Sequence, residues 1–123
     1  MLQITSVVAA TAAIALIPLS ISVSFQRMKT GVRVGFGDDE TLMRRIRAQG
    51  NFVEYVPLAL IVLGLAEYRG APEPLLLAAA GLLIVGRCLH FVGIISGRSA
   101  IRAPGMLATY GALLLGAVTL LLA

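Results

Sequence analysis

Residues 44–68, RRIRAQGNFVEYVPLALIVLGLAEY, contain the features that decide the fold of this chain of 123 residues. The segment opens with three arginines, and the run from about Ala48 to Tyr68 that follows is predominantly apolar. A helix of about 20 mostly apolar residues is long enough to cross the hydrocarbon core of a bilayer. The segment therefore predicts a membrane-spanning helix with a basic entrance.

Three more stretches with few charges surround this one. The four predicted spans run from about Leu2 to Phe25, Ala48 to Tyr68, Leu75 to Ile95 and Ala103 to Ala123. Only 13% of the residues are charged and 59% are hydrophobic, with a mean hydropathy of +0.94, whereas roughly a quarter of a soluble domain is charged. The single cysteine, Cys88, excludes a disulfide within the chain. We expect an all-α membrane protein, a four-transmembrane-helix bundle that forms one domain over residues 1–123.

The basic residues divide unequally among the connections between the spans. The first connection holds Arg27, Lys29, Arg33, Arg44, Arg45 and Arg47, the third holds Arg98 and Arg102, and the second holds Arg69 alone. Cytoplasmic loops carry an excess of Lys and Arg, so both termini are expected to face away from the cytosol. Because the first basic residue follows the first apolar stretch, a retained helix is favoured over a signal peptide. We therefore attribute the net charge of +4 to the membrane topology. Membrane lipids are the expected partners, and nucleic acid is not.

The first connection itself has two parts. Gly35-Phe36-Gly37 is typical of a turn, because no strand precedes it as a nucleotide-binding fingerprint requires. Asp38-Asp39-Glu40 is expected to form an N-cap and first helical turn, where acidic side chains complement the helix dipole. A metal site at this triplet is the alternative. A helix from this cap to Tyr68 would be about 30 residues and roughly 45 Å long, and it would project into the cytosol.

Ionisable residues inside membrane spans are costly and often functional. We identify three, Glu54, Arg87 and His90, with the polar Asn51 beside them. Glu54 and Arg87 can meet at one level, so one interpretation is a buried ion pair that locks the helix packing. The other interpretation is an anionic ligand. It is favoured because the arginines at this end of the bundle outnumber the single intramembrane acid. This excess comprises Arg44, Arg47, Arg87, Arg98 and Arg102.

The remaining polar and small residues of the third span have simpler interpretations. His90 is expected to be a neutral, hydrogen-bonded residue of the bundle, because neither a second His nor a suitably spaced Cys supports a metal site. Arg87, His90, Phe91, Ile94 and Arg98 are expected on one face of this helix. Gly93 and Gly97 form a Gly-x-x-x-Gly pair, which permits close helix approach.

The run Arg44-Arg45-Ile46-Arg47-Ala48-Gln49-Gly50-Asn51-Phe52-Val53-Glu54-Tyr55-Val56-Pro57 resembles the signature of the MAPEG family, the membrane-associated proteins of eicosanoid and glutathione metabolism. The resemblance continues through Gly-Arg-x-x-His-x-x-Gly at residues 86–93 and Arg102-Ala103-Pro104. It covers nearly the whole chain, and the short length and Gly105-Met106 look like the bacterial branch. The resemblance implies a homotrimer in the bacterial inner membrane, with glutathione as co-substrate in clefts between subunits at the cytosolic side.

The same resemblance implies roles for individual residues. The positions that match glutathione-binding residues are Arg44, Arg47, Asn51, Glu54, Tyr55, Arg87 and His90. Arg102, with Arg98 as second choice, matches the catalytic arginine that stabilises the thiolate, although some members place a further arginine where this chain has Met106. No metal is implied.

The activity implied is that of a glutathione transferase, or a glutathione-dependent peroxidase, acting on hydrophobic electrophiles or lipid hydroperoxides that enter from the bilayer. The alternative is a non-enzymatic lipid- or amphiphile-binding protein that uses the same clefts. A small transporter built on Glu54, Arg87 and His90 is less favoured, because the sequence shows no broken helix.

Overall fold

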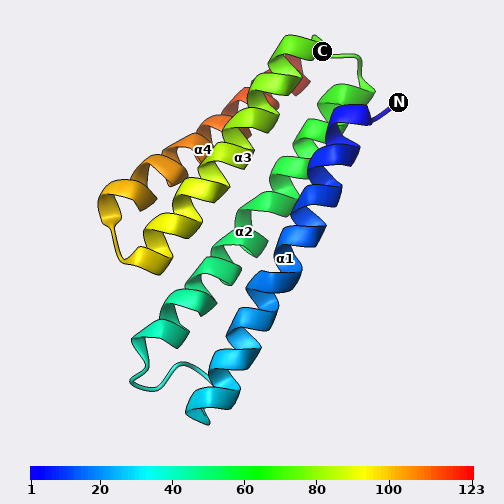
Figure 1. Cartoon of the computed structure of the whole chain (residues 1–123). Helices are drawn as coiled ribbons and strands as arrows, with labels where there is room; N and C mark the ends of the chain where they lie inside the picture. Colours follow the sequence, from blue (N-terminus) through cyan, green and yellow to red (C-terminus); the bar gives the residue numbers. More distant parts are fainter.

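The computed structural model describes all 123 residues as four α-helices (Figure 1). They are α1 (Gln3–Thr30), α2 (Glu40–Tyr68), α3 (Glu73–Ser96) and α4 (Ser99–Leu122). All four are long and apolar enough to cross a membrane, which confirms the prediction of an all-α chain with four membrane-spanning helices. The helices extend beyond the predicted spans mainly at the end where α1 leads into α2, because the polar residues there continue the helices past the apolar stretches.

The ends of α2 and α3 show how local sequence sets the helix boundaries. The carboxylate of Asp39 accepts a hydrogen bond of 2.9 Å from the Leu42 N–H, so α2 begins at the predicted N-cap. Gly35 and Gly37 have positive φ angles of 70° and 55°, as expected of a turn. Gly97 ends α3 in the left-handed conformation with φ of 72°. Gly97 is therefore the C-cap that reverses the chain, and an added Cβ there would still lie 2.9 Å from the Arg44 side chain of α2.

The helices form two antiparallel hairpins, α1–α2 and α3–α4, whose connections lie at the same end of the bundle (Figure 1). Both termini lie at the end of the bundle where α2 turns into α3. The other end, formed by residues 31–39 and by the turn at Gly97 and Arg98, is called the basic end here. At the basic end the α1–α2 hairpin extends beyond the α3–α4 hairpin (Figure 1), in agreement with the long second helix predicted from the acidic cap.

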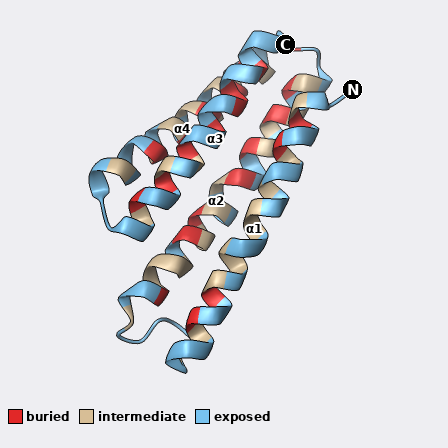
Figure 2. Ribbon diagram, in the orientation of Figure 1, coloured by how far each residue is buried: buried red, intermediate tan, exposed pale blue.

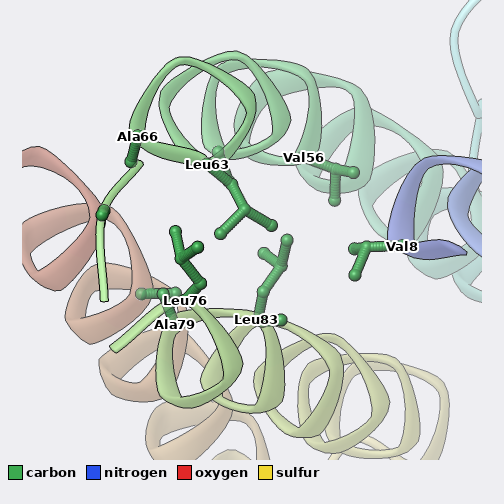
Figure 3. Close-up of a cluster of buried hydrophobic side chains, with 11 residues drawn as sticks. Val8, Val56, Leu63, Ala66, Leu76, Ala79 and Leu83 are labelled. Carbon is green, nitrogen blue, oxygen red and sulfur yellow. The ribbon is translucent and has the colours of Figure 1, made fainter. Parts of the chain in front are cut away.

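The hydrophobic core lies between α2 and α3, and α1 and α4 contribute at its sides. Leu63 of α2 points toward Leu76 and Leu83 of α3, while Val8 of α1 lies near Val56 (Figure 3). Buried positions follow the facing sides of the helices, and the outward sides are exposed (Figure 2). Exposed apolar faces of this kind are expected where lipid replaces water as the solvent.

Helices α3 and α4 pack with their backbones in close contact. A Cβ atom added to Gly93 would lie 2.3 Å from the Arg102 backbone nitrogen, and one added to Gly105 would lie 2.4 Å from the His90 nitrogen. The prediction that Gly93 permits close helix approach is thus confirmed. This approach fixes the position of Arg102 relative to α3.

A charged residue that was not among the three predicted, Glu67 of α2, holds the start of α1. Its carboxylate accepts hydrogen bonds of 2.8 Å from the backbone N–H groups of Ile4 and Thr5, and one of 2.6 Å from the Thr5 hydroxyl. The first N–H groups of a helix have no partner within the helix. Glu67 therefore caps α1 from a neighbouring helix, and the number of ionisable residues in the predicted spans is four rather than three.

Candidate functional site

A cleft of about 630 Å³ opens between α2, α3 and α4 near the basic end. Sixteen residues line it, and we call it the basic cleft. Seven of the predicted site residues are among them: Arg44, Arg47, Asn51, Glu54, Tyr55, His90 and Arg102. Five of these seven come from one face of α2, because steps of three or four residues, from 44 to 47, 47 to 51 and 51 to 54 or 55, keep side chains on one side of a helix. The sequence signature thus forms one wall of the basic cleft, and α3 and α4 supply the others.

Positive charge exceeds negative charge in and beside the basic cleft. Arg44 pairs with Glu40 at 2.6 Å, and Arg47 lies 4.0 Å from Glu54. These are the only ion pairs within 4.0 Å in the chain, so Arg102 has no carboxylate partner. Both members of the Arg47–Glu54 pair are 54% exposed, and an exposed pair at this distance contributes little to stability. Arg47, Glu54 and Arg102 are therefore available to a ligand, while Arg44 shares its guanidinium with Glu40.

The neighbouring arginine of the same motif has a different role. Arg45 points away from the basic cleft and donates to the Ser22 carbonyl at 3.1 Å and to the Gln26 side-chain oxygen at 3.3 Å. The Gln26 amide in turn donates to Asp39 at 2.9 Å. Arg45 therefore fastens α2 to α1. Because a shift of one residue turns a side chain by about 100° around a helix, adjacent arginines serve opposite faces.

Arg87 does not form the expected ion pair with Glu54. Its guanidinium donates instead to the Asn51 side-chain oxygen at 2.6 Å and to the Asn51 backbone carbonyl at 3.4 Å. Glu54 lies three positions after Asn51 on α2. Its side chain is therefore rotated by about 60° around the helix axis, toward the basic cleft and away from α3. The interpretation of an ion pair that locks the packing was therefore wrong, and Asn51 takes the place of the acid.

Two of the predicted site residues lie outside the basic cleft. Arg87 borders a second pocket on another face of α3, and Arg98 occupies the exposed N-cap position of α4. The single polar face predicted for α3 is in fact divided, since His90 and Ile94 border the basic cleft while Arg87 and Phe91 border the second pocket. Arg87 and His90 are three residues apart, a rotation of about 60° around the helix, and this is enough to place Arg87 outside the basic cleft.

The structure adds Tyr110 to the site. Its ring lies 5.7 Å from that of Tyr55 in an edge-to-face arrangement, and the two hydroxyl oxygens are 3.5 Å apart. Edge-to-face pairs of this kind are favourable, and each tyrosine keeps a polar hydroxyl available. Tyr110 was not among the residues predicted for the site. A signal existed, because Arg102, Met106 and Tyr110 recur every four residues and so share one face of α4.

The arrangement is suited to a polar ligand with negative charge. Three arginines provide planar guanidinium donors that match carboxylate oxygens, and Glu54 provides an acceptor for a cationic group. His90 is buried, with 4% of its surface exposed. The chain has no group of three or more His, Cys, Asp or Glu side chains placed to hold a metal ion. These side chains can bind a polar ligand and stabilise negative charge on it.

Comparisons with known proteins agree with this description. The sequence profile of the MAPEG family matches residues 5–122. Inner membrane protein YecN of Escherichia coli strain K12 is 33% identical over 113 residues, which cover 92% of this chain and 86% of that protein. The protein of the same name from Escherichia coli O6:H1 strain CFT073 matches to the same extent.

Proposed function

The chain belongs to the MAPEG family, and from this membership we propose that it is a membrane-bound glutathione transferase whose basic cleft holds the tripeptide. The observation that carries the proposal is the convergence of Arg44, Arg47 and Arg102 on one cleft together with Glu54. Glutathione has two carboxylates and one ammonium group. With its thiol ionised, glutathione carries three negative groups and one positive group, which complement the three arginines and Glu54 in number and sign.

Each group of the tripeptide has a partner in the cleft. Arg44 and Arg47 lie one turn apart on α2 and bind the two carboxylates, while Glu54 accepts from the α-ammonium group. Asn51 contributes its amide N–H₂ group, because its side-chain oxygen is already occupied by Arg87. Tyr55 and Tyr110 offer hydroxyl groups on the side of the cleft toward the hydrophobic interior.

Arg102 stabilises the reactive form of the ligand. The thiolate is the nucleophile, and an ordinary thiol with a pKa of about 8.5 is mostly protonated at neutral pH. A cation without a carboxylate partner lowers the free energy of the thiolate relative to the thiol, and Arg102 meets this condition. The sulfur then bonds to an electrophilic carbon, the leaving group departs with the electron pair of the broken bond, and the thiol proton passes to solvent.

The second substrate is an apolar electrophile that enters from the bilayer. Leu107, Ala103 and Ile94 give the cleft an apolar side beside its arginines. With a lipid hydroperoxide the same thiolate supports peroxidase chemistry, in which two glutathione molecules are oxidised to one disulfide and the hydroperoxide is reduced to an alcohol and water. Both reactions start from the same stabilised thiolate, so Arg102 is needed for each.

We further propose that the protein acts as a homotrimer in the bacterial inner membrane. The named relatives are inner membrane proteins, and the distribution of basic residues favours the basic end in the cytosol, with both termini on the other side. The basic cleft has half-exposed charged residues on its rim. A neighbouring subunit that covers this rim would complete an inter-subunit site.

The proposal is tested by assaying purified protein with glutathione and a chromogenic aryl halide. We expect turnover in the wild type, a loss of about 10²–10³ in kcat for Arg102→Ala, as removing one charge-stabilising donor typically causes, and near wild-type rates for Arg98→Ala. Arg98 is the matched control, since it is four residues away and does not line the cleft.

Equal rates in the two variants would remove the catalytic role of Arg102. A phospholipid headgroup that copurifies in the cleft and is not displaced by millimolar glutathione would instead favour the amphiphile-binding alternative.

A further inference from the structure

A second pocket of about 500 Å³ lies between α1, α2 and α3, and we call it the lateral pocket. Its walls are largely apolar and include Pro18 and Leu19 of α1, Phe52 of α2 and Phe91 of α3. It does not share a single lining residue with the basic cleft. The volume lies within the range of about 300–1,000 Å³ that is typical of small-molecule sites.

One charged side chain borders this apolar space. Arg87 is half-buried, and it has no carboxylate within 4.0 Å. Its two hydrogen bonds both go to oxygens of Asn51, which are neutral and leave the positive charge uncompensated. A guanidinium has five N–H donors, so Arg87 retains donors for a further acceptor. Charged groups in the membrane interior are normally paired or functional.

We propose that the lateral pocket binds a single-chain anionic amphiphile of the fatty-acid class, with its carboxylate on Arg87 and its hydrocarbon chain along the apolar walls. Charge complementarity selects this occupant, since a neutral chain would leave the Arg87 charge uncompensated and a bare anion would leave the apolar walls unfilled. Such a molecule reaches the pocket from the surrounding bilayer. The proposal is independent of glutathione chemistry, because the two sites have separate linings.

The Asn51–Arg87 hydrogen bond forms the partition between the two sites. Asn51 lines the basic cleft and Arg87 lines the lateral pocket, and the bond that joins them is 2.6 Å long. A carboxylate on Arg87 shares the same guanidinium group with Asn51. The chain therefore places the proposed lipid site one hydrogen bond away from the basic cleft.

The test measures equilibrium binding of radiolabelled palmitate and of hexadecanol, its uncharged counterpart with the same chain length, to the purified protein in phosphatidylcholine nanodiscs. We expect palmitate to bind about tenfold more tightly than hexadecanol, because a hydrogen bond to a charged group is stronger than one between neutral groups. Arg87→Met should abolish this preference and Arg87→Lys should retain most of it. The matched control is Arg33→Met, which removes an exposed charge from the connection between α1 and α2.

A second pair of variants tests the pocket without altering Arg87. Leu19→Trp fills the lateral pocket and should weaken binding of both ligands several-fold, while Ile17→Trp on the exposed side of the same helix should not. Equal affinity for palmitate and hexadecanol in the wild type, or full palmitate binding in Leu19→Trp, would overturn the proposal. So would a preference that is lost in Arg47→Met but kept in Arg87→Met, because the charge would then reside in the basic cleft.

Discussion

Replacing Gly93 by alanine perturbs the contact that positions Arg102. The added Cβ would lie 2.3 Å from the Arg102 backbone nitrogen and 2.5 Å from its Cα. Both neighbours are main-chain atoms of α4, which cannot rotate away as the end of a flexible side chain can. The helices must therefore separate near the basic cleft.

The size of the effect follows from this geometry. Real Cβ contacts rarely fall below 3.4 Å, so α3 and α4 have to move apart by about 1 Å at this point. Overpacking of a close-packed interior costs about 1–3 kcal/mol. The same movement displaces Arg102, so turnover with glutathione should fall together with stability.

Gly81 provides the matched control on the same helix, because an added Cβ there meets no atom within 4 Å. Gly81→Ala should leave stability unchanged or raise it, since alanine is favoured over glycine in a helix interior by roughly 1 kcal/mol. Thermal unfolding of both variants in one detergent, followed by circular dichroism, gives the comparison. Equal stability of Gly93→Ala and Gly81→Ala would refute the close backbone packing.

Three further predictions concern single side chains at the helix ends and in the basic motif. Hydrogen bonds from the Gln26 amide and then the Leu42 N–H lower the pKa of Asp39 below its ordinary 3.8. The ionised carboxylate therefore stabilises the fold fully above pH 4, and this stabilisation disappears as pH falls through the folded-state pKa. The unfolding free energy of Asp39→Ala should depend less on pH in this acid range than that of the wild type. Glu67→Ala should destabilise the fold by about 1–2 kcal/mol through loss of the cap and accelerate hydrogen exchange at the start of α1. Arg45→Met should lower stability by about 1 kcal/mol without changing glutathione affinity.

The sequence was sufficient to predict the four helices because membrane spans depend on length and apolar composition, which are local properties. The start of α2 at Asp39 was also predictable, since an N-cap is a contact over three residues. Glu67 was missed because its partners lie 62 and 63 residues away at the start of α1. Nothing in the apolar stretch around Glu67 indicates which helix end it will meet.

The site shows the same division between local and non-local information. The α2 residues of the basic cleft follow from helical spacing within one motif, and all of them line the cleft. Arg87 was assigned to this site because the family resemblance implied it and because it lies at the same end of the bundle as the other arginines, and its depth matched that of Glu54. Depth does not determine which way a side chain faces, and the rotation of α3 directs Arg87 to Asn51 and the lateral pocket.

The central claim, that the basic cleft binds glutathione, is tested most directly by thermal unfolding of the wild type across a glutathione titration. A ligand that binds only the folded state stabilises it by about 2.7 kcal/mol at 100 times its dissociation constant. We predict a saturable rise in the unfolding temperature that is also present in Arg45→Met and is strongly reduced in Arg47→Met. An unchanged unfolding temperature at millimolar glutathione, or an equal rise in both variants, would contradict the claim.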